Sequence, residues 1–293
     1  MRWYAPSTID EPIDKSIDKT KNKVTSENAA MSNFFKNIIL GGSALLLAAC
    51  GSNDDVLKIG AMAGEEEQVA EIAAEVAKQQ FGLQVEIVAF SDYVTPNEAL
   101  NDGSIDLNAF QHRPYLDAQV EARGYDIVAV ANTFVYPIAA YSQKLDSLEA
   151  LEAGSKVALP NDPSNLGRSL VLLEQQGLLV LKPEAGINAT TRDIVENPLN
   201  LEILELEAAQ LPRSLNDVAF AVINNSFAGM SGLTLEEHGL FVESKESPYV
   251  NLIVARSNNQ QDERVQQFIE AYQSEPVYQK AYELFQGNIV KGW

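Results

Sequence analysis

The sequence has few of the residues that build disulfides, metal centres or nucleic-acid surfaces. It contains one cysteine and two histidines in 293 residues, so no internal disulfide can form and a metal site built on these side chains is not expected. Lysine and arginine number 21 against 41 aspartates and glutamates, which leaves a formal net charge of -20. A chain this acidic repels a phosphate backbone, so nucleic acid is not an expected partner.

The apolar run that precedes the cysteine is too short to span a bilayer. Ile38–Ala49 falls short of the roughly 20 residues that a spanning helix needs, but it suits the apolar region of a signal peptide. It leads into Leu47-Ala48-Ala49-Cys50, the form of a bacterial lipobox, in which the cysteine receives a lipid. We therefore predict a signal peptide within residues 1–49, Cys50 as the lipidated mature N-terminus, and a tether over residues 50–56. A buried helix with a core cysteine is the alternative.

The residues before Met31 are polar and carry charges of both signs, unlike the start of a usual signal peptide. Beginning at Met31 instead would give a signal peptide of ordinary length. We therefore interpret residues 1–30 as an over-extended start and leave them out of the fold. The two possible starts are Met1 and Met31.

Beyond the tether, short apolar runs alternate with amphipathic ones, which is the pattern of an α/β fold with a largely parallel sheet. Leu57–Ala61 and Gln84–Phe90 predict strands. A helix is predicted between them over Glu65–Phe81, with an acidic first turn and a glycine as its stop. The same reading predicts strands at Ile105–Phe110 and Ile127–Ala131 and a helix at Arg113–Arg123.

The alternation starts again near residue 156. Lys156–Leu159 predicts a strand and Leu166–Gln176 the helix that follows it. Further strands are predicted at Leu201–Leu206, Phe220–Ile223 and Tyr249–Ala255, and helices at Thr191–Glu196, Ser226–Leu233, Asp262–Tyr272 and Glu275–Phe285. We therefore predict two α/β lobes with a hinge and a ligand cleft between them. Lobe 1 comprises residues 57–135 and 252–293, and lobe 2 comprises residues 136–251.

The segment Pro160–Leu170 (PNDPSNLGRSL) opens the predicted helix of lobe 2 and places Arg168 in its first turn. A cation is unfavourable there, because the start of a helix already carries partial positive charge. An arginine beside a helix start selects a carboxylate or a phosphate, so we interpret Arg168 as the holder of an anion that the chain does not encode. Ser164 or Asn165 is expected to cap the helix, and Gly167 to let a ligand approach the backbone. A surface salt bridge of Arg168 is the alternative.

Aromatic and amide side chains gather directly after two other predicted strands, in Phe90–Asn97 and Asn108–Tyr115. Such side chains would face the cleft, where aromatic walls suit an apolar or thioether group. Asn224 and Asn251 lie at the ends of two further strands. Taken singly, each of these residues could instead belong to the core or to a turn. The catalytic and nucleotide-binding motifs G-x-S-x-G, the P-loop and the dinucleotide fingerprint are absent, so we expect no enzyme activity and no cofactor.

Together these segments resemble the NlpA family of lipoproteins, which deliver methionine to an ABC importer. The resemblance covers nearly all of Leu57–Trp293. It rests on seven motifs in the family's order: Asp92–Leu100 (DYVTPNEAL), Asn108–His112 (NAFQH), Thr133–Pro137 (TFVYP), Pro160–Leu170, Gln210–Leu215 (QLPRSL), Ala221–Asn224 (AVIN) and Val290–Trp293 (VKGW). One departure is Ala219, where the family often has an acid, which bears on a neighbouring turn rather than on the pocket.

The resemblance implies a two-lobed periplasmic binding protein that closes over one amino acid. Arg168, helped by Asn165, would hold the ligand carboxylate. Asn224 and Asn251 would orient the α-amino and carboxylate groups. The other four matching positions would surround the thioether side chain: Tyr93, Phe110, His112 and Tyr115.

The same resemblance implies the partners: methionine, an importer permease with its ATPase, and a membrane reached through Cys50. The protein would then be exported and anchored to a bacterial membrane, facing the periplasm or the cell exterior. L-methionine, D-methionine and short derivatives all remain open as ligands, because the family includes binders of each. Two other functions stay as alternatives, namely a surface lipoprotein or adhesin that retains the pocket and a hydrolase built on the same scaffold.

Overall fold

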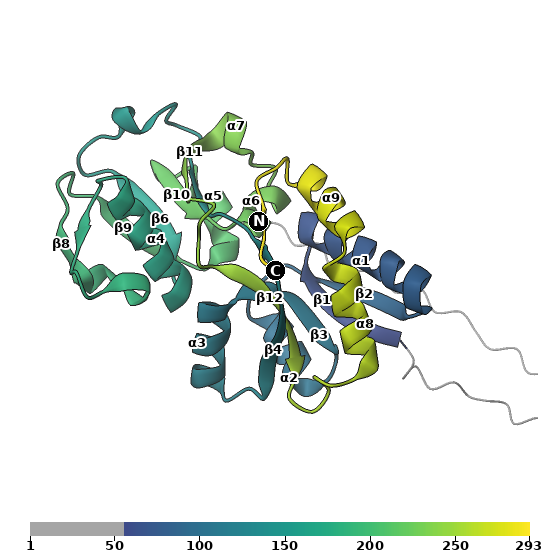
Figure 1. The fold of residues 1–293 in the computed structure, drawn as a ribbon. Coiled ribbons are helices and arrows are strands. Elements are labelled where there is room, and N and C mark those ends of the chain that lie inside the picture. The colour runs from purple at the N-terminus through teal and green to yellow at the C-terminus, as the bar shows by residue number, and fades with distance from the viewer. Residues whose placement is uncertain (1–55) are drawn as a thin grey trace, which may run out of the picture. The chain divides into compact units, whose positions relative to one another are not determined.

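The computed structural model describes residues 56–293, so the predicted signal peptide, Cys50 and nearly all of the tether lie outside the described residues. The described chain forms two main sheets, of six and of five strands, each with its own helices (Figure 1). The predicted two-lobed α/β fold is confirmed. Within residues 56–293, no helix is both long and apolar enough to cross a membrane.

The first sheet has the strand order β13-β4-β12-β3-β1-β2. Its strands are β1 (Val56–Met62), β2 (Gln84–Phe90), β3 (Leu107–His112), β4 (Ile127–Val135), β12 (Val250–Arg256) and β13 (Val290–Lys291). Its helices are α1 (Glu65–Phe81), α2 (Thr95–Asp102), α3 (Arg113–Arg123), α8 (Glu263–Tyr272) and α9 (Glu275–Leu284). Strands β1, β2 and β3 are parallel, whereas β12 runs antiparallel between β3 and β4. The sheet is therefore mixed rather than largely parallel.

Strand β12 shows how this sheet is buried on both faces. Ile253 and Ala255 belong to the core that α1, α8 and α9 cover. Leu252 and Val254 point to the opposite face and belong to the core beneath α2 and α3. Because successive side chains of a strand alternate between faces, an uninterrupted apolar run is what a strand covered on both sides requires.

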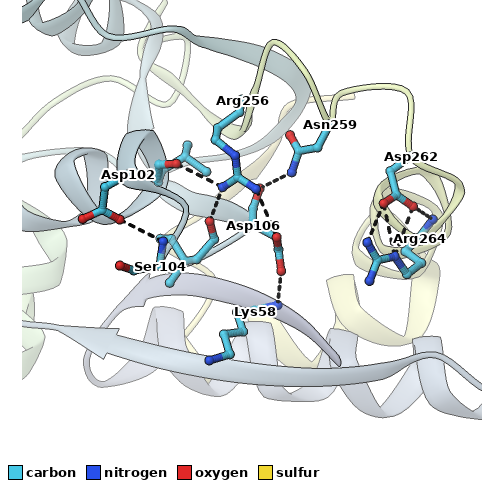
Figure 2. Close-up of polar contacts among 10 residues, drawn as sticks. Lys58, Asp102, Ser104, Asp106, Arg256, Asn259, Asp262 and Arg264 are labelled. Atoms are coloured by element: carbon cyan, nitrogen blue, oxygen red, sulfur yellow. Dashed lines mark hydrogen bonds and ion pairs between the residues drawn. The ribbon is translucent and has the colours of Figure 1, made fainter. Parts of the chain in front are cut away.

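A polar cluster lies at the edge of the first sheet where β3 starts (Figure 2). Arg256 donates to the carbonyl of Leu100 at 3.0 Å, donates to the carbonyl of Ile105 and pairs with Asp106 Oδ1 at 3.2 Å. Asp106 also accepts from the backbone N–H of Lys58 at 3.0 Å through Oδ2, and its carbonyl accepts from Asn259 at 2.9 Å. These contacts connect the end of β12 to β1 and to the start of β3. The candidate functional site lies at the other end of β3.

The second sheet has the strand order β11-β5-β10-β6-β9. Its strands are β5 (Ala139–Tyr141), β6 (Lys156–Pro160), β9 (Glu202–Leu206), β10 (Phe220–Ile223) and β11 (Gly239–Val242), and its helices are α4 (Pro163–Gln175), α5 (Leu211–Ser214), α6 (Asn225–Met230) and α7 (Leu235–His238). Strands β9, β6 and β10 are parallel, and β5 and β11 add antiparallel pairs at one edge. A small hairpin of β7 (Val180–Leu181) and β8 (Ile194–Glu196) lies apart from this sheet.

Several predicted elements have the bounds that the pattern gave, among them α1, β2, α3 and β10. The helix predicted at Thr191–Glu196 is wrong, because a 3₁₀ turn at Thr191–Asp193 leads directly into β8. Helix α2 and strand β5 were not predicted. Both elements are short. Strand β5 pairs with β10 and β11, which come much later in the chain, so a local sequence pattern does not reveal it.

The two lobes contact each other through a shared apolar cluster. Met62, Phe110 and Tyr115 come from the side of the first sheet, and Leu211 and Phe227 come from α5 and α6 beside the second. Within the described chain, the backbone passes from one sheet to the other after β4 and again before β12. Phe110 and Tyr115 of this cluster, and Tyr136 of the first crossing, also line a cavity.

Candidate functional site

One cavity brings together all eight residues that the sequence singled out. It has an empty volume of about 350 Å³, counting the space at its mouth. Those residues are Tyr93, Phe110, His112, Tyr115, Asn165, Arg168, Asn224 and Asn251. They come from both lobes. On the side of the first sheet, four lie after β2, in β3 and in α3, and Asn251 lies in β12. On the side of the second sheet, three lie in α4 and after β10. The carboxyl ends of parallel strands in both sheets meet here, where ligand crevices form in α/β proteins.

Aromatic rings form one wall of the cavity. The centroid of Tyr93 lies 5.7 Å from that of Phe110 and 5.9 Å from that of Tyr115, and Phe227 packs against Tyr93 at 4.6 Å. The hydroxyl of Tyr115 donates to the carbonyl of Tyr93 at 2.8 Å. Burial raises the pKa of both tyrosines, so they remain neutral phenols and present an apolar surface.

Hydrogen bonds fix the orientation of the amide of Asn165. Asp162 caps α4 by accepting from the backbone N–H of Asn165 at 2.9 Å and also accepts from its side-chain nitrogen at 3.0 Å. The side-chain oxygen of Asn165 therefore faces the cavity side, where Asn224 Nδ2 donates to it at 2.9 Å. The predicted cap at Ser164 or Asn165 is wrong. The cap is Asp162, and α4 begins three residues earlier than expected because Pro163 suits its first position.

His112 completes this network as a neutral ring. Its Nδ1 lies 3.2 Å from the backbone N–H of Tyr115, so Nδ1 accepts and Nε2 carries the proton toward the Asn165 oxygen, also 3.2 Å away. Burial and, after it, the positive charge of Arg168 lower the pKa of His112 to about 3. The ring therefore links the two lobes without carrying charge.

Arg168 occupies the sixth position of α4, so the prediction that placed it in the first turn is wrong. Its side chain is 3% exposed, which also rules out a surface salt bridge. Nε donates to Glu243 Oε1 at 2.9 Å, Nη2 donates to Glu243 Oε2, and Nη2 also donates to the carbonyl of Tyr136 at 3.0 Å. The guanidinium lies 4.3 Å above the ring of Tyr249.

The chain therefore encodes an anion for Arg168, contrary to the expectation from sequence. Glu243 accepts hydrogen bonds from the Nε edge of the planar guanidinium group, whereas Nη1 makes no hydrogen bond to any described residue. Because Arg168 also lines the cavity, this second edge of the guanidinium is left for a bound group.

The glycine before Arg168 has a structural role. A Cβ on Gly167 would lie 2.2 Å from the carbonyl oxygen of Ile187, in the 3₁₀ turn Gly186–Asn188 that packs against α4. The expectation that Gly167 admits a ligand is wrong, because it is this turn that approaches the backbone. The side chain of Asn251, which lines the cavity, donates to the carbonyl of Phe110 at 3.0 Å.

The cavity also has lining residues that sequence reasoning missed. They are Glu66, Gln111, Tyr136, Asn225 and Ser226. Glu66 resembles an ordinary acid in the first turn of α1, and nothing in the linear sequence shows that its carboxyl is buried. Among residues 56–293, no group of three or more histidines, cysteines, aspartates and glutamates is arranged to hold a metal ion.

Two α/β lobes that are joined by two crossings around a buried aromatic and polar cavity define a two-lobed substrate-binding protein. The family model described as NlpA lipoprotein matches residues 57–293. The chain belongs to this family, as the sequence motifs predicted.

Individual relatives agree with this assignment. The chain is 59% identical over 259 residues to the probable D-methionine-binding lipoprotein MetQ of Vibrio cholerae, covering 87% of this chain and 96% of the relative. A crystal structure of the methionine-binding protein MetQ is 58% identical, with a TM-score of 0.80 over 82% of this chain and 98% of that one. A nutrient-binding protein from Burkholderia cenocepacia, solved bound to methionine, is 45% identical, with a TM-score of 0.78 over 81% of this chain and all of that one.

Proposed function

We propose that this protein captures one methionine, in the L or D form or as a derivative, and delivers it to an ABC importer made of a permease and its ATPase. The observation that carries the proposal is the open edge of Arg168. This buried cation reaches the same cavity as the aromatic wall of Tyr93, Phe110 and Tyr115. A free amino acid with a long apolar side chain has groups that match both.

Energetic considerations support a thioether ligand. Burying a methionine side chain contributes roughly 1.5–3 kcal/mol, and each sulfur–aromatic contact adds about 0.3–1.5 kcal/mol. The carboxylate would take the Nη1 edge of Arg168, with Asn165 and Asn251 nearby in the lining. Charged ends of a ligand then fix its orientation, because an analogue that lacks them leaves buried polar groups unpaired.

We further propose that the lobes 57–135 with 252–293 and 136–251 move as a hinge. Two contacts that support this join opposite lobes: His112 to Asn165 at 3.2 Å, and Tyr93 Oη to Ser226 Oγ at 3.1 Å. Both would break on opening. Ligand would favour the closed form by binding it more tightly than the open form, and the transporter would recognise the closed lobes.

The proposal includes an exported protein that is held to a membrane through lipidated Cys50 and that performs no catalysis. The relatives are named as binding proteins and lipoproteins, which supports both parts. A surface lipoprotein that merely retains the pocket would have no need to bind an amino acid tightly.

The test is to identify the bound ligand directly. Native mass spectrometry of the purified protein should show one amino acid per chain, and calorimetry after unfolding and refolding should show binding of L- or D-methionine. Glutamate serves as a control ligand, since the charged carboxylate of its side chain is costly to bury against an aromatic wall. If the protein carries no amino acid as purified and binds none after refolding, the proposed function is wrong.

A further inference from the structure

Glu66 is an acid in a place where acids are rarely stable. It is the second residue of α1, the residue is only 3% exposed, and it lines the cavity. Its neighbour Glu67 already serves the helix start by accepting from the backbone N–H of Gly64 at 3.3 Å. Glu66 is therefore not needed to cap α1, and its burial requires another explanation.

The two carboxyl oxygens of Glu66 have different surroundings. Oε1 accepts from the hydroxyl of Ser226, which comes from α6 in the opposite lobe. Oε2 is buried and has no hydrogen-bond partner within residues 56–293. In the ionised form of Glu66 this oxygen is a buried acceptor without a donor, which costs about 1–3 kcal/mol, so the carboxylate requires a donor that a bound ligand can supply.

A second unpaired acceptor lines the same cavity. Asn224 must donate through Nδ2, because the Asn165 atom that it meets is an oxygen held in that orientation by Asp162. Asn224 Oδ1 is then an acceptor, and it too is buried without a partner among the described residues. Two orphan acceptors suit a group that carries several N–H donors, and an ammonium group carries three.

The charges around the cavity agree with this. Arg168 is the single lysine or arginine among the described lining residues, and Glu243 already neutralises it. The titratable groups that face Glu66 are Glu65 on its own helix, Tyr93 after β2, Tyr136 after β4 and Tyr272 on α8. None of these is a cation, so nothing in the described chain supplies the positive charge that a buried carboxylate needs.

We propose that Glu66 is a further ligand-contacting residue, whose carboxylate together with Asn224 holds the α-ammonium group of the bound amino acid and loses its own proton on binding. This inference rests on the proposed function, since it assigns the second charged end of the ligand of that same cavity. Arg168 and Glu66 then bind the two ends of a zwitterion.

The proton balance follows from the environment of the empty site. Burial raises the pKa of Glu66 to about 8, and the Ser226 hydrogen bond only partly opposes this. At pH 7 the empty site therefore holds a neutral carboxylic acid. An ammonium group placed beside it favours the ionised form, so the O–H bond breaks, the proton leaves to solvent and a carboxylate remains in contact with the ammonium.

Calorimetry of methionine binding at pH 7, in buffers of different ionisation enthalpy, measures the released proton directly. Wild-type protein should release about one proton for each methionine bound. Glu66→Gln keeps the shape of the side chain but cannot ionise, so it should release none and bind methionine roughly tenfold more weakly or worse. Glu71→Gln, on the exposed side of the same helix, is the matched control and should match wild type.

A second ligand distinguishes binding at the proposed ammonium subsite from binding to the rest of the cavity. 4-(Methylthio)butanoate is methionine without its amino group, and it should bind weakly with no proton release and with similar affinity in wild type and Glu66→Gln. Equal proton release by wild type and Glu66→Gln, or an unchanged affinity of Glu66→Gln for methionine, would overturn the assignment of Glu66.

The ligand proposal can fail separately. If wild type ignores methionine but captures another amino acid with release of a proton that Glu66→Gln does not release, then the ligand is wrong and the ammonium subsite stands. If neither D-methionine nor any of the twenty common amino acids is captured, both proposals are overturned. Thermal melts of each variant, compared with wild type, show whether the substitution has disturbed the fold.

Discussion

Arg168 and Glu243 form a two-point ion pair inside the protein, 75 residues apart in sequence. Glu243 follows β11 and exchanges contacts with Ile138, which lies in the other crossing between the sheets. The arginine that faces the ligand cavity is thus held by both segments that connect the lobes. The charge beside the cavity and the contact between the two connecting segments therefore depend on the same pair.

Glu243→Gln tests this relationship. Removing one charge of a buried pair leaves the other uncompensated, and we expect a loss of about 3–5 kcal/mol in the free energy of unfolding, measured by urea titration. Methionine affinity should also fall, because the guanidinium is no longer held. Glu246→Gln, exposed in the same loop, is the control. Unchanged stability and affinity would show that Glu243 does not position Arg168.

Substitutions of Arg168 separate charge from shape. Arg168→Lys keeps the positive charge but loses the planar fork, so it should bind methionine roughly tenfold to a hundredfold more weakly in calorimetry. Arg168→Ala and Asn251→Ala should lose most binding while the fold survives, as circular dichroism would show. Near-normal affinity in both alanine variants would refute the assigned site.

Glu66 predicts a pH dependence for the ligand-free protein. Because its folded pKa of about 8 lies above the ordinary value of 4.5, the folded state holds more protons than the unfolded state between these values. Its contribution to stability is therefore lost as pH rises through that window. Glu66→Gln has no such loss, so its Tm should rise relative to wild type between pH 5 and pH 8. A constant difference in Tm across the window would contradict the raised pKa.

Two neighbouring positions of α4 give a test of packing. Gly167→Ala would place a methyl group against the carbonyl of Ile187, and we expect a loss of about 1–3 kcal/mol in the free energy of unfolding. Ser169→Ala removes a buried hydroxyl that has no partner among the described residues, so it should change stability little or raise it. Equal effects of the two substitutions would argue against the close contact at Gly167.

Lipidation at Cys50 can be tested by cell fractionation. Cys50→Ala should release the protein from membranes, since a lipid on this cysteine is the expected anchor. Continued retention of the variant in the membrane fraction would contradict the anchor. Ser52→Ala, two residues further along the predicted tether, is the control.

The sequence predicted the fold class and eight residues of the cavity, but it did not predict the partners of those residues. Repeated alternation of apolar and amphipathic segments was enough for two α/β lobes, because covered sheets require apolar strands and helices with one apolar face. All eight residues that were predicted from the sequence line one cavity. Glu66 could not be found this way, since an acid at a helix start is ordinary until the opposite lobe buries it.

The sequence by itself therefore determined where most strands and helices form. It also determined that aromatic, amide and guanidinium groups follow the ends of the strands. Only the tertiary structure decided which charges meet. Glu243 reaches Arg168, and Ser226 of the opposite lobe reaches Glu66, across 75 and 160 residues. Sequence pattern cannot show such pairings, because burial and distance between remote segments set both the pKa of an acid and the partner of a cation.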